Sequence, residues 1–252
     1  MMRFFTLIVT ACLASSAFAA ETPTITEAYS CTLNPGQTMA DFDKAAAAWQ
    51  ADMDEIPGGD QYFAAVLTPL RANVPFDLLW LGSSANLNNW AKNTAVYNES
   101  AEGRAAQRRF DKVAMCGSGL WYAETLHEGL APAEVGSTSV VEAYQCSLRE
   151  GKTLANVSAA NASWLGVIKA ESVASPAVAK FDGYMFTPFL ANVDYDVAYL
   201  VVHEDLAGFG AMNTSLVTSA GNAGVAAGFD DTFRCTGGLW NGKLLRQPAM
   251  QE

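Results

Sequence analysis

The sequence is poor in cationic side chains and in the residue patterns that mark common catalytic sites. It has 15 lysines and arginines against 26 acidic residues, and its two histidines are His127 and His203. It contains no Gly-x-Ser-x-Gly motif, phosphate-binding loop or dinucleotide fingerprint. The acidic balance argues against a nucleic-acid partner, which needs a basic surface.

Long hydrophobic runs are absent after the first twenty residues. Residues 1–20 carry Arg3, an apolar run over 4–13 and the sequence Ala17-Phe18-Ala19, a pattern typical of a cleavable secretory signal. A lipoprotein processing site at Cys12 is the less favoured alternative, because so few residues precede it. No later run approaches the ~18 apolar residues of a spanning helix. We therefore predict an exported, soluble protein, periplasmic or secreted.

Cysteines are few, and none occurs in a Cys-x-x-Cys pair, which argues against a redox or zinc motif. Without Cys12, the mature chain keeps Cys31, Cys116, Cys146 and Cys235. An even number of cysteines in an exported protein indicates disulfides.

The sequence does contain a long internal repeat. The pattern Thr-Pro-x-x-Ala-Asn-Val-x-aromatic-Asp at 68–77 recurs at 187–196, and Cys-x-x-Gly-Leu-Trp occurs at 116–121 and at 235–240. Such widely spread matches predict a tandem duplication of a domain-sized unit. We expect a signal peptide at 1–20, a first repeat at 21–126, a linker at 127–140 and a second repeat at 141–252.

The two repeats show the same order of predicted elements. Apolar alternation around Cys31 predicts a strand, and Thr38 is placed to cap a helix that carries Trp49 on its apolar face. Two strands, a second helix and a fourth strand follow in each repeat. Strands are predicted near 29–33, 62–67, 76–81, 113–116, 184–186, 195–202 and 233–235, and helices from Thr38, Ser84, Thr153 and Asp205. Segments 98–109 and 217–228 are expected to be connections, with at most a further helical turn in the first.

This order, taken twice, is the ferredoxin-like arrangement. The chain resembles the dimeric α+β barrel superfamily, in which two such units pack their sheets face to face. The resemblance covers almost all of the mature sequence and rests on element order and the repeat. It implies an α+β fold in which two βαββαβ repeats form an intrachain pseudo-dimeric barrel. It also implies a monomer, because the second repeat takes the place of a partner chain.

The resemblance also implies a disulfide pairing. In this topology the first and fourth strands of a unit are antiparallel neighbours, so Cys31 can meet Cys116 and Cys146 can meet Cys235. Each bridge would contribute ~2–5 kcal/mol to stability.

One polar pattern occurs in both repeats, the Asn and Asp of Ala-Asn-Val-x-aromatic-Asp. Its structural interpretation is a hairpin, in which Asn and Asp satisfy backbone groups. Its functional interpretation is a pair of rims around a cleft. The candidate ligand-binding residues are Asn73, Asp77, Trp80, Asn192, Asp196, Tyr199 and His203.

Two classes of function follow. A non-catalytic module that binds a small molecule or a partner is favoured, because no catalytic constellation is evident. The alternative comes from the resemblance, which implies a monooxygenase-like or haem-handling enzyme with His203, Asp77 or Asp196 as candidate residues. A structural envelope protein is a third option. The residues predict no cofactor and no metal site, and haem is a candidate only through the resemblance.

Overall fold

The computed structural model describes residues 24–219 and 221–248. The expected signal peptide and the alternative lipidation site at Cys12 lie outside the described residues. Within these two ranges, no helix is long and apolar enough to cross a membrane.

Eight antiparallel strands form a closed barrel in the order β1-β3-β2-β8-β5-β7-β6-β4. Each half of the chain contributes four neighbouring strands in the ferredoxin-like order, so the expected α+β barrel is confirmed. The strands are β1 (Thr24–Leu33), β2 (Phe63–Arg71), β3 (Leu78–Ser84), β4 (Ala114–Glu128), β5 (Thr138–Leu148), β6 (Asp182–Leu190), β7 (Val197–His203) and β8 (Phe233–Arg246).

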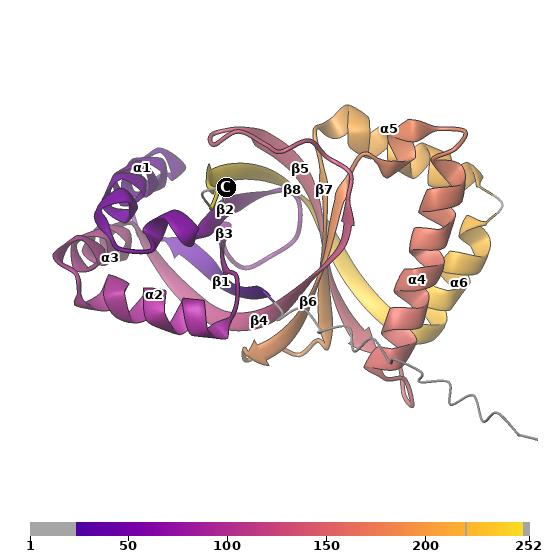
Figure 1. Ribbon diagram of the computed structural model, residues 1–252, viewed down its shortest axis with the longest axis horizontal. Helices are drawn as coiled ribbons and strands as arrows, with labels where there is room; N and C mark the ends of the chain where they lie inside the picture. Colours follow the sequence, from indigo (N-terminus) through magenta and orange to yellow (C-terminus); the bar gives the residue numbers. More distant parts are fainter. Residues whose placement is uncertain (1–23, 220, 249–252) are drawn as a thin grey trace, which may run out of the picture.

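The helices cover the barrel on two opposite sides, with those of the first half on one side and those of the second half on the other (Figure 1). They are α1 (Met39–Glu55), α2 (Leu87–Glu99), α3 (Ala101–Val113), α4 (Leu154–Glu171), α5 (Leu206–Thr218) and α6 (Asn222–Thr232), with short 3-10 turns η1 (Gly59–Gln61) and η2 (Pro176–Ala179). Thr38 caps α1 as expected, and Asp41 completes the capping box. The buried face of α1 includes Phe42 and Trp49, which pack on the sheet.

Segments 98–109 and 217–228, expected to be connections, are largely helical and belong mainly to α3 and α6. Ser100 starts α3, because its hydroxyl accepts a hydrogen bond from the Gly103 N–H at 2.9 Å. Gly103 and Ala106 are buried, so α3 presents small side chains to its neighbours instead of a broad apolar stripe. The polar composition of these segments concealed that narrow packing face.

The last strand of each half is much longer than the sequence predicted. Residues 114–116 and 233–235 are only the first residues of β4 and β8, which contain 15 and 14 residues, and Val113 is the last residue of α3. Each strand first pairs within its own half and then pairs with the other half, β4 with β6 and β8 with β2. β4 and β5 therefore extend into the segment expected as a linker, and the connection between them spans 129–137.

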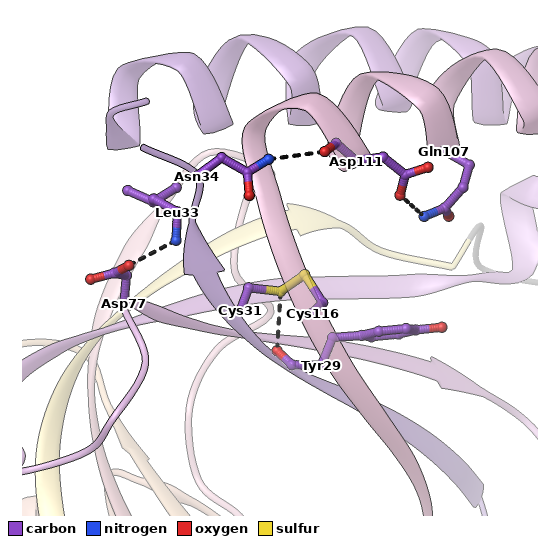
Figure 2. Close-up of a disulfide and its surroundings, with 8 residues drawn as sticks. All are labelled: Tyr29, Cys31, Leu33, Asn34, Asp77, Gln107, Asp111 and Cys116. Carbon is purple, nitrogen blue, oxygen red and sulfur yellow. Dashed lines mark hydrogen bonds between the residues drawn. A yellow bond between two sulfur atoms is a disulfide. The ribbon is translucent and has the colours of Figure 1, made fainter. Parts of the chain in front are cut away.

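Two disulfides tie the first strand of each half to the last. Cys31 bonds Cys116 and Cys146 bonds Cys235, and each pair occupies directly opposed positions in the β1–β4 or β5–β8 ladder. Figure 2 shows the first of these bridges, at the end of β1. Both follow the pairing implied by the ferredoxin-like topology.

The extended parts of β4 and β8 carry side chains into the core of the opposite half. Leu245 of β8 is 4% exposed and lies in the cluster that contains Trp49 and Trp80 of the first half. Leu126 of β4 packs against the cluster that contains Tyr199 of the second half. The cores of the two halves are therefore completed reciprocally.

Leu245→Ala should lower the free energy of unfolding by about 2–5 kcal/mol, because it opens a cavity in the core of the first half. Both halves should unfold in one transition, measured by urea denaturation with tryptophan fluorescence. Leu70→Ala, at an exposed position of β2, is the control and should cost less than about 0.5 kcal/mol. Two separate transitions, with only one sensitive to the Leu245 change, would contradict reciprocal completion of the cores.

Candidate functional site

The inner face of the barrel encloses a cavity of about 440 Å³. Its walls are mainly apolar and include Leu81, Leu200, Trp121 and Trp240, all buried. No charged side chain lines this cavity in the part of the chain that the structure describes. Four polar lining residues, Ser30, Asn73, Gln145 and Thr236, are exposed and mark the mouth through which the cavity meets solvent, whereas the lining residue Thr26 is buried.

The two copies of the repeated Ala-Asn-Val pattern meet at that mouth. β2 and β6 run in the same direction around the antiparallel barrel, so the loops that follow them, 72–77 and 191–196, lie at the same end. Residues Asn73 and Phe76 of one loop and Val193 and Tyr195 of the other line the cavity. Both halves thus build the same opening.

The glycine of each Cys-x-x-Gly-Leu-Trp motif allows a loop of the other half to lie against the strand. A Cβ atom at Gly238 would lie 2.6 Å from the Ala72 Cβ, and a Cβ atom at Gly119 would lie 2.8 Å from the Ala191 Cβ. Such approaches leave no room for a side chain at either position. The repeated motif therefore keeps the loop close to the barrel, and its tryptophan lines the cavity just inside.

Aromatic side chains from the two halves form the walls next to the mouth. Phe76 stacks on Trp240, with ring centroids 5.9 Å apart and an interplanar angle of 20°. Tyr195 and Trp121 occupy the matching positions and also line the cavity. None of these four residues was among the candidates predicted from the sequence, although the recurrence of Trp121 and Trp240 in a shared motif was a signal that could have identified them.

Asp77 and Asp196 are engaged with the backbone. The Asp77 carboxylate accepts a hydrogen bond from the Leu33 N–H at 2.8 Å (Figure 2), and Asp196 accepts one from the Leu148 N–H at 2.7 Å. Their own N–H groups donate to the carbonyls of Cys31 and of the matching cysteine of β5. In this arrangement each Asp fastens its loop to the first strand of its half.

The other predicted ligand-binding residues lie in different parts of the fold. Asn73 lines the cavity mouth, whereas Asn192 is exposed and does not line it. Trp80 faces the helices, where its ring meets Trp49 with centroids 4.7 Å apart. Tyr199 borders the cavity, but its hydroxyl donates to the Asn161 side chain of α4 at 3.0 Å.

His203 lies outside the cavity, fully buried between the sheet and α5. Its Nε2 is 2.8 Å from Glu142 Oε1, and Tyr144 and Asn213 also donate hydrogen bonds to the Glu142 carboxylate. Burial acts to raise the pKa of Glu142, but the hydrogen bonds from His203 and Tyr144 outweigh it and lower that pKa. His127 is likewise remote from the mouth, with Nε2 2.8 Å from the Ala179 carbonyl oxygen.

The first half keeps a related cluster without histidine. Glu27 matches Glu142 and accepts hydrogen bonds from the hydroxyls of Tyr29 and Tyr62, both at 3.0 Å. Ser84 stands at the position that matches His203. No group of three His, Cys, Asp or Glu side chains is placed to hold a metal ion in the residues that the structure describes.

Solved structures with a similar fold cover most of the chain. A candidate monooxygenase from Fusobacterium nucleatum is 7% identical, with 90% of this chain and 94% of that chain covered and a TM-score of 0.59. A candidate monooxygenase from Lactobacillus acidophilus is 11% identical, with 90% and 98% covered and a TM-score of 0.56. A candidate chlorite dismutase is 14% identical, with 89% and 95% covered and a TM-score of 0.53.

The fold shared with these structures is the α+β barrel, formed here within one chain. At these identities the likeness concerns the fold. No protein-family model matches the sequence. No curated protein matches it either.

The names of these similar structures are those of enzymes. They contradict the expectation that this barrel is a non-catalytic binding or interaction module. That expectation rested on the absence of catalytic motifs, which is a poor guide in a fold whose site is built from barrel-lining residues of both halves.

Glu142→Gln should lower stability at pH 7 by about 1–3 kcal/mol, because the carboxylate accepts several buried hydrogen bonds. Since the folded state lowers the pKa of Glu142, its stabilisation is complete above the ordinary value near 4.5 and is lost as the pH falls through the lowered value. The difference between wild type and variant should therefore shrink on acidification, measured by urea denaturation from pH 7 to pH 3.

The exposed Glu134→Gln variant is the control and should show no comparable difference at any pH. A Glu142→Gln penalty that grows as the pH falls would show that the carboxylate is not stabilised by its hydrogen bonds in the folded protein.

Proposed function

We propose that this protein is an exported, monooxygenase-like enzyme that oxidises a small, uncharged and largely apolar molecule inside the barrel. The observation that carries the proposal is the cavity itself, which is open at one end, walled by aromatic and aliphatic residues and free of charged lining side chains.

The size and chemistry of the cavity suit a ligand of this kind. Pockets for small molecules are commonly a few hundred Å³ in volume and mainly apolar, with a few polar groups that fix orientation. Here most of the polar lining groups are exposed at the mouth and the tryptophans are buried, so an apolar ring would enter past Asn73 and Gln145 and lie between aromatic walls. The monooxygenase names of similar structures support this reaction class.

The contribution of the chain would be binding, orientation and exclusion of water. No carboxylate, histidine or lysine lines the cavity among the described residues. The hydroxyls of Tyr144 and Tyr199 already donate to Glu142 and Asn161, so the Tyr195 hydroxyl is the lining phenol that would donate or hold a proton. A fitting reaction takes its electrons from the substrate: a CH₂ group and O₂ give a C=O group and water, which balances without another reductant.

Haem is the cofactor that the superfamily resemblance suggests, but the cavity offers poor ligands for it. Its lining has no histidine, cysteine or methionine within the described chain. Burial raises the pKa of the lining tyrosines Tyr144, Tyr195 and Tyr199, which opposes the deprotonation that iron binding requires.

His203 has a buried Nδ1 with no hydrogen-bond partner, the one feature that favours a ligand role. Its side chain is 0% exposed, however, and Phe181 and Phe209 pack around it. A haem does not fit beside His203 in this arrangement, so we route no step through one.

Export is part of the same proposal. Disulfides persist in oxidising compartments, and both halves of the barrel contain one. The pattern of residues 1–20 supports a secretory signal, which N-terminal sequencing of the exported protein would test.

Ala143→Phe should place a ring in the cavity and weaken both ligand binding and turnover about tenfold or more. The assay is oxygen consumption with a set of uncharged two- and three-ring phenols and ketones, with binding measured separately by tryptophan fluorescence. Ala47→Phe, on the exposed face of α1, is the matched control and should leave both unchanged.

Equal oxygen consumption by wild type and Ala143→Phe would contradict a reaction inside the barrel. Activity that appears only with added haem, together with an absorption band that is lost in His203→Ala, would replace this proposal with a haem-handling function.

A further inference from the structure

We infer that Tyr195 selects the substrate of this cavity, by donating a hydrogen bond to an oxygen acceptor on an uncharged ring compound. The inference rests on the proposed function, because it concerns the same cavity. It adds the chemical class of the substrate and the residue that distinguishes it from a plain hydrocarbon.

The backbone beside Tyr195 is held in place. The following residue, Asp196, donates its N–H to the Cys146 carbonyl at 3.0 Å and accepts the Leu148 N–H at 2.7 Å. Cys146 is in turn bonded to Cys235. A side chain carried by such a fixed loop can position a ligand at low entropic cost, since little ordering is left to occur on binding.

The matching position in the other half shows what Tyr195 adds. Phe76 occupies it, lines the same cavity and stacks on Trp240. The two positions thus offer equivalent aromatic surface and differ by one hydroxyl group. That hydroxyl is the chemical asymmetry between the two aromatic walls at the mouth.

The hydroxyl is suited to be a donor. Burial raises the pKa of Tyr195, with the indole of Trp121 beside it acting in the opposite direction, so the phenol remains protonated at neutral pH. Within the described chain, no residue accepts a hydrogen bond from this hydroxyl. Its proton is therefore available to a ligand.

The lining also excludes one class of acceptor. A carboxylate or phosphate taken into the cavity would lose water without meeting a lysine or arginine, because no charged side chain lines it. Burying an unpaired charge is costly, whereas a carbonyl oxygen needs only one donor to offset its lost hydration. The substrate class is thus a neutral ring compound with a ketone, quinone or similar oxygen.

The test compares two probes of nearly equal shape, 9-fluorenone and fluorene, which differ in one carbonyl group. Dissociation constants are measured by tryptophan fluorescence for wild type, Tyr195→Phe and the reciprocal control Phe76→Tyr. Wild type should bind fluorenone roughly 3- to 10-fold more tightly than fluorene, the range of one hydrogen bond. Tyr195→Phe should lose that preference and keep the same affinity for fluorene, while Phe76→Tyr, which retains Tyr195, should keep the preference.

Each outcome bears on a separate claim. Fluorene and fluorenone binding equally to wild type, or an undiminished preference in Tyr195→Phe, would overturn the role of Tyr195 and leave the cavity as the binding site. Tighter binding of fluorenone-2-carboxylate than of fluorenone would overturn the uncharged substrate class. Failure of every probe to bind would contradict the proposed function itself.

Discussion

The barrel is closed by two strand pairings between the halves of the chain, and the other features depend on this closure. β8 of the second half pairs with β2, and β4 of the first half pairs with β6. These pairings carry Leu245 and Leu126 into the opposite cores, enclose the cavity and bring the loops 72–77 and 191–196 to one end. Neither half encloses the cavity or forms its mouth without the other, and each half receives one core side chain from the other.

The matching halves share a backbone plan but differ in sequence at most positions, and two of these differences concern the cavity and the buried Glu142 cluster. On the inner face, Tyr195 of the second half occupies the position of Phe76 in the first half. On the helix side, His203 of the second half occupies the position of Ser84. The inner difference changes the mouth of the cavity, whereas the outer one changes a buried hydrogen-bond cluster around Glu142. We therefore place recognition at Tyr195 and a structural role at His203, although both are single-site departures from the repeat.

Most of the element order could be predicted from the sequence, because strand alternation and the Thr38 cap are local signals. The disulfide pairing joins cysteines 85 and 89 residues apart, and it followed from the topology that the resemblance implies. The site could not be predicted. The alternation of apolar and polar residues along β3 and β7 distinguishes the two faces of each strand, but it does not show which face lines the barrel. Trp80 and Tyr199 were therefore predicted as ligand-binding residues, although the Trp80 ring and the Tyr199 hydroxyl contact the helices. The length of β4 and β8, which decides where Trp121 and Trp240 lie, comes from pairing with strands that are distant in the sequence.

A crystal structure grown with 2-bromo-9-fluorenone tests the central claim most directly, because the bromine can be located from its anomalous signal. We predict one bromine site inside the barrel, with the ring between the walls that contain Trp121 and Trp240 and its carbonyl oxygen within hydrogen-bond distance of the Tyr195 hydroxyl. A ring bound between the sheet and α5 beside His203, with the barrel cavity free of the probe, would contradict it.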